Sequence, residues 1–148
     1  MRQIKFRGKR VDNGDWVEGS YHYSADGKYH YILALEKFNE RVGKEMMLHT
    51  AEVNLIDPAT VGQFTGLIDK NGKEIWEGDI LFCHEYDSSD CGHMIVQTFK
   101  NAVVGFGSGS YYYYPKGNMK MPHQLLMYAY EPEIIGNIHD NHSLLTNK

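Results

Sequence analysis

The chain has 148 residues, of which 42% are hydrophobic, so it can form one domain or two small lobes with a core and is not a disordered segment. Its formal net charge of −4 excludes a global attraction to nucleic acid or to acidic membranes. Two cysteines are too few for a disulfide scaffold. The sequence shows no signal segment and no apolar run that approaches a length of roughly 20 residues, which predicts a cytoplasmic protein without a membrane partner.

The first half of the chain has the pattern of short antiparallel strands separated by glycine turns. Aromatic residues make up 13% of the chain and glycine occurs 15 times, which is typical of pleated, half-buried strands and tight turns. Asn13-Gly14 and Asp26-Gly27 are strong hairpin signals. They predict an N-terminal antiparallel meander with strands at 3–10, 16–23 and 29–35. The charged residues 36–47 suit either a loop or one frayed helix.

The second half continues the same pattern with little helix. Strands are predicted at 48–56, 61–67, 80–86, 93–99, 102–106 and 134–138. Pro122 suits the first position of a short helix over 121–128, which Pro132 would end, and "DNHSLL" predicts a closing helical turn. We expect a mainly β fold in a single domain over residues 1–148, with two lobes that divide near residues 40–56, at about 1–50 and about 51–148.

Three stretches carry the most distinctive residues of the chain: "IKFRGKRVDNGDWVEGSY" at 4–21, "TVGQFTGLIDKNGKEIWEGDIL" at 60–81 and "EIIGNIHDNHSLL" at 133–145. Together they resemble the YopX family of phage and prophage proteins, over nearly the whole chain. The resemblance implies a phage or prophage gene and a small barrel-like lobe, but it brings no established activity. The chain departs from the family at Asn141-His142-Ser143, where members often have Asn-Pro-Glu.

The shared motifs suit structural roles. Asn71-Gly72 is expected to form a tight turn between two strands, and Gly78-Asp79 to lie between a turn and the next apolar strand. An equivalent Gly-Asp pair is common in small SH3-like barrels. Gly136 suits a bulge or a close approach of the backbone. We therefore interpret the motif residues as fold residues: Gly62, Gly66, Asp69, Gly72, Gly78, Asp79 and Gly136.

The stretch "CHEYDSSDCGH" at 83–93 carries four side chains that zinc could bind. A hairpin closed by residues 87–90 would place His84 opposite His93 and Cys83 on the other face of the sheet. His84, Cys91 and His93 then remain as weak candidates for a metal site, because their spacing departs from structural zinc motifs. The alternative is a hairpin with a solvated histidine pair. We predict that this hairpin binds no metal and that the protein has no cofactor.

Two strands carry candidate binding residues. Lys5, Arg7 and Lys9 alternate onto one face, which could hold phosphates or be the wet face of an edge strand. Tyr111, Tyr112, Tyr113 and Tyr114 would alternate in pairs, with one pair in the core and the other at a protein interface or stacked on bases. The acidic net charge favours the interface.

These observations favour a non-enzymatic protein-interaction or assembly module that forms a homo-oligomer and binds an unknown phage or host protein in the bacterial cytoplasm. The alternative is a nucleic-acid-binding module that uses the basic strand and the tyrosine strand. A second alternative is a metal-dependent enzyme built on the Cys/His hairpin. No nucleophile with an adjacent base is identifiable from spacing.

Overall fold

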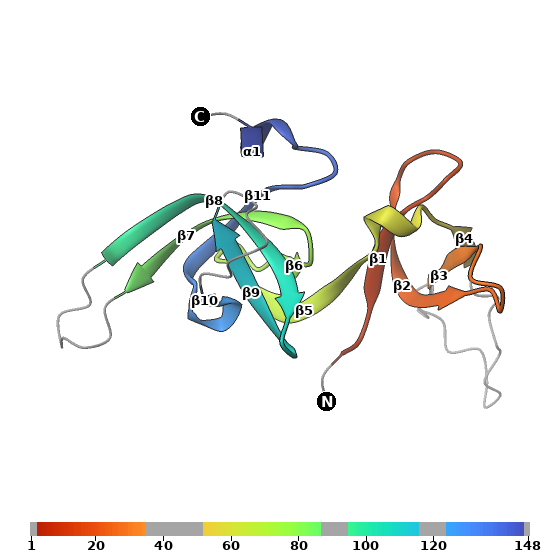
Figure 1. Cartoon of the computed structure of the whole chain (residues 1–148), viewed down its shortest axis with the longest axis horizontal. Helices are drawn as coiled ribbons and strands as arrows, with labels where there is room; N and C mark the ends of the chain where they lie inside the picture. The colour runs from red at the N-terminus through yellow and green to blue at the C-terminus, as the bar shows by residue number, and fades with distance from the viewer. Residues whose placement is uncertain (1–2, 35–51, 87–94, 116–123, 147–148) are drawn as a thin grey trace, which may run out of the picture. The chain divides into compact units, whose positions relative to one another are not determined.

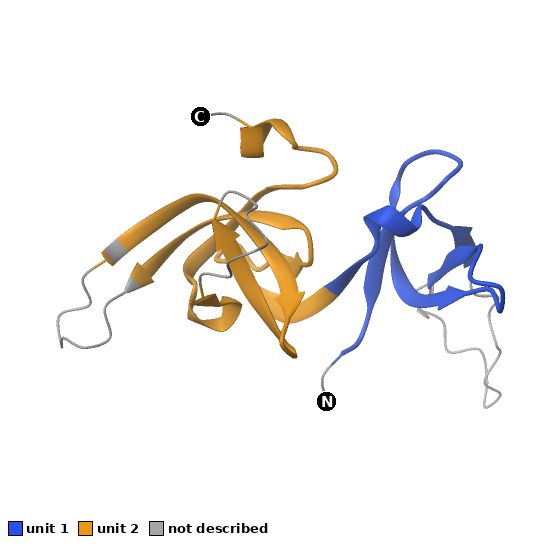
Figure 2. Ribbon diagram, in the orientation of Figure 1, with its two compact units in different colours: residues 1–63 blue, residues 64–148 orange. Residues whose placement is uncertain are grey.

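The computed structural model describes residues 3–34, 52–86, 95–115 and 124–146 (Figure 1). The chain forms two compact units, residues 1–63 and residues 64–148 (Figure 2). The units divide between Gln63 and Phe64 instead of near residue 50, because the strand that follows residue 51 pairs with the meander. Strands are the main element of both units in the described residues, which confirms the mainly β class. Neither sheet is closed, so an SH3-like barrel is not confirmed.

Unit 1 contains the predicted meander. Its strands are β1 (Phe6–Lys9), β2 (Trp16–Tyr23), β3 (His30–Ala34) and β4 (Glu52–Leu55), each antiparallel to the one before it. A short 3-10 turn, η1 (Pro58–Thr60), leads into β5 (Gly62–Ile68), whose first residues pair with β1. Ile32 and Ile56 are buried inside unit 1. The predicted loop or helix at 36–47 lies outside the described residues.

A single antiparallel bridge between Arg10 and Ile56 links the end of β1 to the end of β4. Beside it, the Val11 N–H donates to the Leu55 carbonyl at 3.0 Å and the Asp57 N–H donates to the Lys9 carbonyl at 2.9 Å. These bonds bring the β1–β2 turn against β4, although more than forty residues separate the two segments.

Unit 2 is a five-stranded antiparallel sheet in the order β10-β9-β8-β7-β11. Its elements are β6 (Glu74–Trp76), β7 (Asp79–Tyr86), β8 (Ile95–Gly107), β9 (Ser110–Pro115), β10 (Gln124–Leu125), η2 (Leu126–Tyr128), β11 (Tyr130–Asn137) and α1 (Ser143–Thr146). β6 pairs with β5 beside this sheet. One core cluster holds Ile75, Leu81, Cys83, Phe99, Ala102, Val104, Tyr113 and Leu126.

Two predictions for unit 2 are corrected by the structure. β8 is one long strand and not two, because Phe99 and Ala102 both pack into the core on either side of the polar pair at residues 100–101. The expected helix at 121–128 is absent from its described part, where β10 pairs with β9 and a 3-10 turn follows. Burial of Leu126 in the core holds that segment to the sheet.

The last elements agree better with the sequence. β11 includes the predicted strand at 134–138 except for its last residue and extends it toward the N-terminus through Pro132. α1 confirms a short helical turn after residue 142. In the described ranges, no helix has both the length and the apolar surface needed to cross a membrane.

Candidate functional site

Asp69 connects two of the distinctive sequence stretches. Its carboxylate accepts the backbone N–H groups of Asn71 at 2.8 Å and Lys73 at 2.9 Å within the β5–β6 turn. The second oxygen accepts the N–H of Ile134 on β11 at 3.2 Å. Burial raises the pKa of Asp69, but hydrogen bonds from Lys73, Ile134 and Asn71 outweigh it, so the pKa lies below its ordinary value. Asp69 therefore acts as an anchor for the backbone.

Gly78, Asp79 and Gly136 hold the backbone in a similar way. Gly78 has a φ of +81°, and its carbonyl accepts the Ile138 N–H at 2.9 Å. Asp79 is buried and accepts the Trp76 N–H at 2.8 Å. A Cβ on Gly136 would lie 2.6 Å from the Asn141 Oδ1 atom, so any larger residue there requires the Asn141 side chain to shift.

The other motif glycines also occupy positions that suit the backbone conformation or the packing of the fold. Gly66 and Gly72 have positive φ angles, and Gly62 is buried beside β1.

The tyrosine strand β9 is mostly packed inside unit 2. Tyr113 lies in the core with Tyr111 against it, and the rings of Tyr112 and Tyr114 lie 6.5 Å apart on the other face, which confirms the predicted alternation. Tyr113 and Tyr114 are buried, so the strand offers less surface to a partner than its sequence suggests. Burial also raises the pKa of Tyr113.

The Cys/His hairpin has a different register from the predicted one. His84 lies opposite Thr98 and not opposite His93, and its Nδ1 lies 2.9 Å from the Thr98 Oγ1. Cys83 lies in the core, where burial raises the pKa of its thiol to about 12. Cys91 and His93 lie outside the described residues. Within the described ranges, no three His, Cys, Asp or Glu side chains form a group that could hold a metal ion.

Lys5, Arg7 and Lys9 share one face of unit 1, as their spacing predicts. The Arg7 Cζ and the Lys9 Nζ lie 4.8 and 5.5 Å from the centre of the Trp16 ring. The Lys5 Nζ lies 3.9 Å from the Glu18 carboxylate. These cations are thus in contact with an aromatic ring and a carboxylate of the same sheet.

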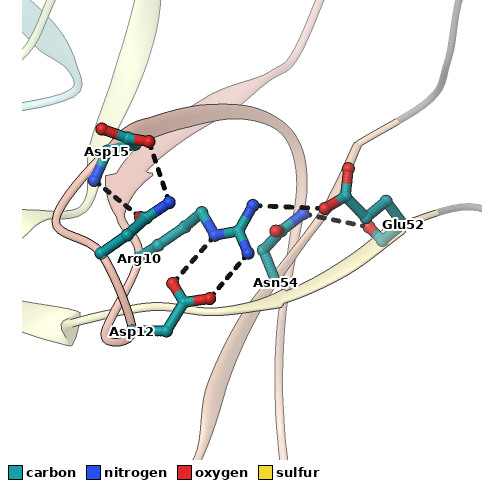
Figure 3. Close-up of polar contacts among 6 residues, drawn as sticks. Arg10, Asp12, Asp15, Glu52 and Asn54 are labelled. Atoms are coloured by element: carbon teal, nitrogen blue, oxygen red, sulfur yellow. Dashed lines mark hydrogen bonds and ion pairs between the residues drawn. The ribbon is translucent and has the colours of Figure 1, made fainter.

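A further cluster surrounds Arg10, and sequence analysis did not identify it (Figure 3). The Arg10 guanidinium donates to both Asp12 oxygens, at 3.0 and 2.7 Å, and to Glu52 at 3.3 Å. The Asp12 hydrogen bond is the main cause that raises the Arg10 pKa, and it lowers the pKa of Asp12. Asp15 lies on the same turn, where it accepts from the Asn13 side chain at 2.8 Å.

This cluster borders a depression of about 320 Å³ on unit 1. The depression is lined by Arg10, Val11, Asp12, Glu52, Val53, Asn54 and Leu55. Val11, Val53 and Leu55 are exposed, whereas Asn54 is buried to 3% exposure and donates from Nδ2 to the Glu52 carbonyl at 3.3 Å. The depression joins apolar walls to fixed charges and offers binding contacts but no activated nucleophile. The sequence shows that Arg10 and Asp12 are two positions apart, but no sequence signal links this pair to Glu52.

Comparisons with known proteins found similarity over nearly the whole chain. A family model described as YopX protein matches residues 5–146. No curated protein matches the chain. Among solved structures, the crystal structure of protein EF1440 from Enterococcus faecalis is similar over 98% of this chain and 99% of that one. The TM-score is 0.52 and the sequence identity is 20%, so this likeness concerns the fold alone.

Proposed function

The chain belongs to the YopX family, and from that premise we propose that it is a non-enzymatic protein-interaction module encoded by a phage or prophage. It acts in the cytoplasm of the bacterial host and binds a phage or host protein through unit 1. The observation that carries this proposal is the depression beside β4, where exposed apolar side chains lie next to an ion-pair cluster.

The composition of the depression suits a protein partner better than a small substrate. Val11 and Val53 are each 61% exposed, so the depression is open to solvent and would not enclose a small molecule as ligand pockets do. Adjacent exposed apolar residues rimmed by charges are typical of protein interaction sites. Arg10 is already held by Asp12 and Glu52, so charged groups at the site have fixed positions before a partner binds.

A matched pair of surface substitutions tests the proposal. Peptides from a random library would be selected on the purified full-length protein, sequenced, and measured by fluorescence anisotropy. We expect Val53→Asp to weaken binding about tenfold or more, because it replaces a valine that the partner would bury. Ile68→Asp is the control, since Ile68 is also 61% exposed but lies in unit 2. Equal loss in both variants, or no peptide that binds, would contradict the proposal.

Self-association is a separate part of the proposal. We propose a homodimer, the commonest closed symmetry, formed through exposed side chains and open strand edges. Met127 and Tyr128 support it, because both are exposed next to each other in η2. Sedimentation velocity at micromolar concentration should give a dimer, and a monomer at every concentration would refute this part.

Nucleic-acid binding is the second candidate function, favoured by the basic face of β1. Arg7, Lys9 and Trp16 form a compact group that could contact phosphate and base. Unit 1 has nine Lys and Arg against nine Asp and Glu, whereas unit 2 with its tyrosine strand carries the entire net charge of −4. A nucleic acid would therefore bind unit 1. Labelled single-stranded DNA should then bind with a steep salt dependence that Lys9→Gln reduces.

A further inference from the structure

Glu131 has an unfavourable backbone conformation near the start of β11. Its φ angle is +45°, in the left-handed region that residues other than glycine rarely adopt. The next residue is Pro132, and a residue that precedes proline favours an extended backbone. Two independent steric preferences therefore oppose the conformation of Glu131, and an extended backbone at this position would satisfy both.

The pairing of β11 with β7 is irregular at the same place. Tyr130 pairs with His84 and Glu133 pairs with Phe82, so two residues of β11 lie opposite one residue of β7. This arrangement is a β-bulge, in which a left-handed residue is normally glycine. The bulge separates Tyr130 from the rest of β11 and from α1, which follow it along the chain (Figure 1). Glu131 thus has the position of a hinge for residues 132–146.

The segment after this hinge is held by residues that come earlier in unit 2. The Ile134 N–H donates to the Asp69 carboxylate at 3.2 Å, and the Ile138 N–H donates to the Gly78 carbonyl at 2.9 Å. The Ile134 side chain also packs against the core cluster. These contacts form one interface between residues 132–146 and the rest of unit 2, and the same residues of a second chain would fit that interface equally well.

We propose that two copies of the chain exchange residues 132–146, with Glu131 as the hinge. In the dimer, β11 of each copy leaves its own β7 and pairs with β7 of the other copy. The exchanged contacts are those of the single chain, so exchange is an inexpensive route to a dimer. Extension of Glu131 removes its left-handed conformation in both copies, which offsets part of the entropy lost on association. This inference rests on the proposed self-association and names the segment that forms the interface.

A disulfide across β7 and β11 distinguishes exchanged from closed chains. Phe82→Cys and Glu133→Cys would be combined in a background that carries Cys83→Ala and Cys91→Ala. Positions 82 and 133 are Cα partners, at a separation that a disulfide can span. In the exchanged dimer this bond joins two chains, whereas in the closed form it stays within one chain. We expect oxidation at micromolar concentration to give a covalent dimer on a non-reducing denaturing gel.

A second cysteine pair is the matched control. Phe106→Cys and Tyr111→Cys are Cα partners across β8 and β9, and both precede the hinge. Their disulfide stays within one chain in either form, so the gel should show only monomer. Equal amounts of covalent dimer from the two pairs would indicate random collision of chains and would overturn the exchange.

Sedimentation of the same proteins separates the exchange from the proposed self-association. Proteins that sediment as dimers but give only monomer on the gel for both cysteine pairs would overturn the exchange and leave the dimer intact. A monomer at every concentration would overturn both.

Two substitutions of Glu131 test the hinge itself. Glu131→Gly accepts a positive φ angle without strain, so it should favour the closed form and raise the dissociation constant of the dimer about tenfold or more. Glu131→Gln removes the same charge but keeps the steric cost, and should change the dissociation constant by less than about twofold, since this side chain is exposed. Equal effects of the two substitutions would overturn the assignment of Glu131 as the hinge.

Discussion

Removal of the Asp69 carboxylate should destabilise unit 2 more than any exposed acidic substitution. Asp69→Ala deletes three hydrogen bonds, from Asn71, Lys73 and Ile134, at a side chain that is only 4% exposed. At about 1 to 1.5 kcal/mol for each bond, the free energy of unfolding should fall by about 3 to 5 kcal/mol. Asp69→Asn keeps one carbonyl oxygen but turns an amide toward the Ile134 N–H, and should cost about 2 kcal/mol.

The assay must report on unit 2 alone. The chain has two tryptophans, Trp16 in unit 1 and Trp76 in unit 2, so a Trp16→Phe background leaves Trp76 fluorescence as the probe of urea unfolding. Asp57→Asn serves as the control, because that exposed carboxylate makes one capping bond in unit 1. An unchanged midpoint for Asp69→Ala, or a loss that Asp57→Asn reproduces, would refute the anchoring role of Asp69.

The same carboxylate predicts a pH dependence. Because the folded pKa of Asp69 lies below its value in the unfolded chain, its contribution to stability is complete above the unfolded pKa and is lost as the pH falls through the folded pKa. The stability difference between the wild type and Asp69→Asn should therefore be constant near neutral pH and shrink below about pH 4. A difference that grows on acidification would contradict this sign.

Three further predictions follow from local geometry. Ser108 and Gly109 both have positive φ angles, as in a type I′ hairpin turn, so Ser108→Asn should raise the free energy of unfolding by about 0.5 kcal/mol, and a lower urea midpoint would count against this assignment. Gly136→Ala should cost about 1 to 3 kcal/mol because the new Cβ would meet the Asn141 side chain, and near-native stability would show that Asn141 can move away. Cys83 should resist iodoacetamide at pH 8 until the protein unfolds, because burial raises the pKa of its thiol to about 12, and rapid labelling of the native protein at this position, read by mass spectrometry, would contradict that burial.

The local features of the fold could be read from the sequence. Asn13-Gly14, Asp26-Gly27 and Asn71-Gly72 each fix a tight turn through neighbouring residues, and the strands beside them follow from alternating apolar positions. The contact of Asp79 was predictable for the same reason, since it accepts from Trp76 only three residues away. Gly78 has the positive φ angle that its turn predicts, but its hydrogen-bond partners, Val104 and Ile138, are distant in the chain. The mainly β class follows from these elements together.

The features that the sequence did not reveal depend on residues that are distant in the chain. Arg10 and Glu52 are 42 positions apart, and the tertiary pairing of the segment after β1 with the end of β4, through the Arg10–Ile56 bridge, brings them together. The extended conformation of Gln124–Leu125 depends on β9, which overrides the local helix signal of Pro122. The register of the β7–β8 hairpin contains two irregularities, and a shift of this kind changes which side chains lie opposite each other.

The position of β7 between β8 and β11 has a consequence for the nascent chain. β8 follows β7 closely in sequence, but the partner for the other edge of β7 is the last strand, β11. At a synthesis rate of 5–20 residues per second, the residues between Tyr86 and Tyr130 take about 2 to 9 s to make, and the open edge of β7, with its unpaired backbone N–H and C=O groups, lacks that partner throughout. During this interval the half-made sheet can pair with other chains, so a chaperone that shields β7 should raise the yield of folded protein.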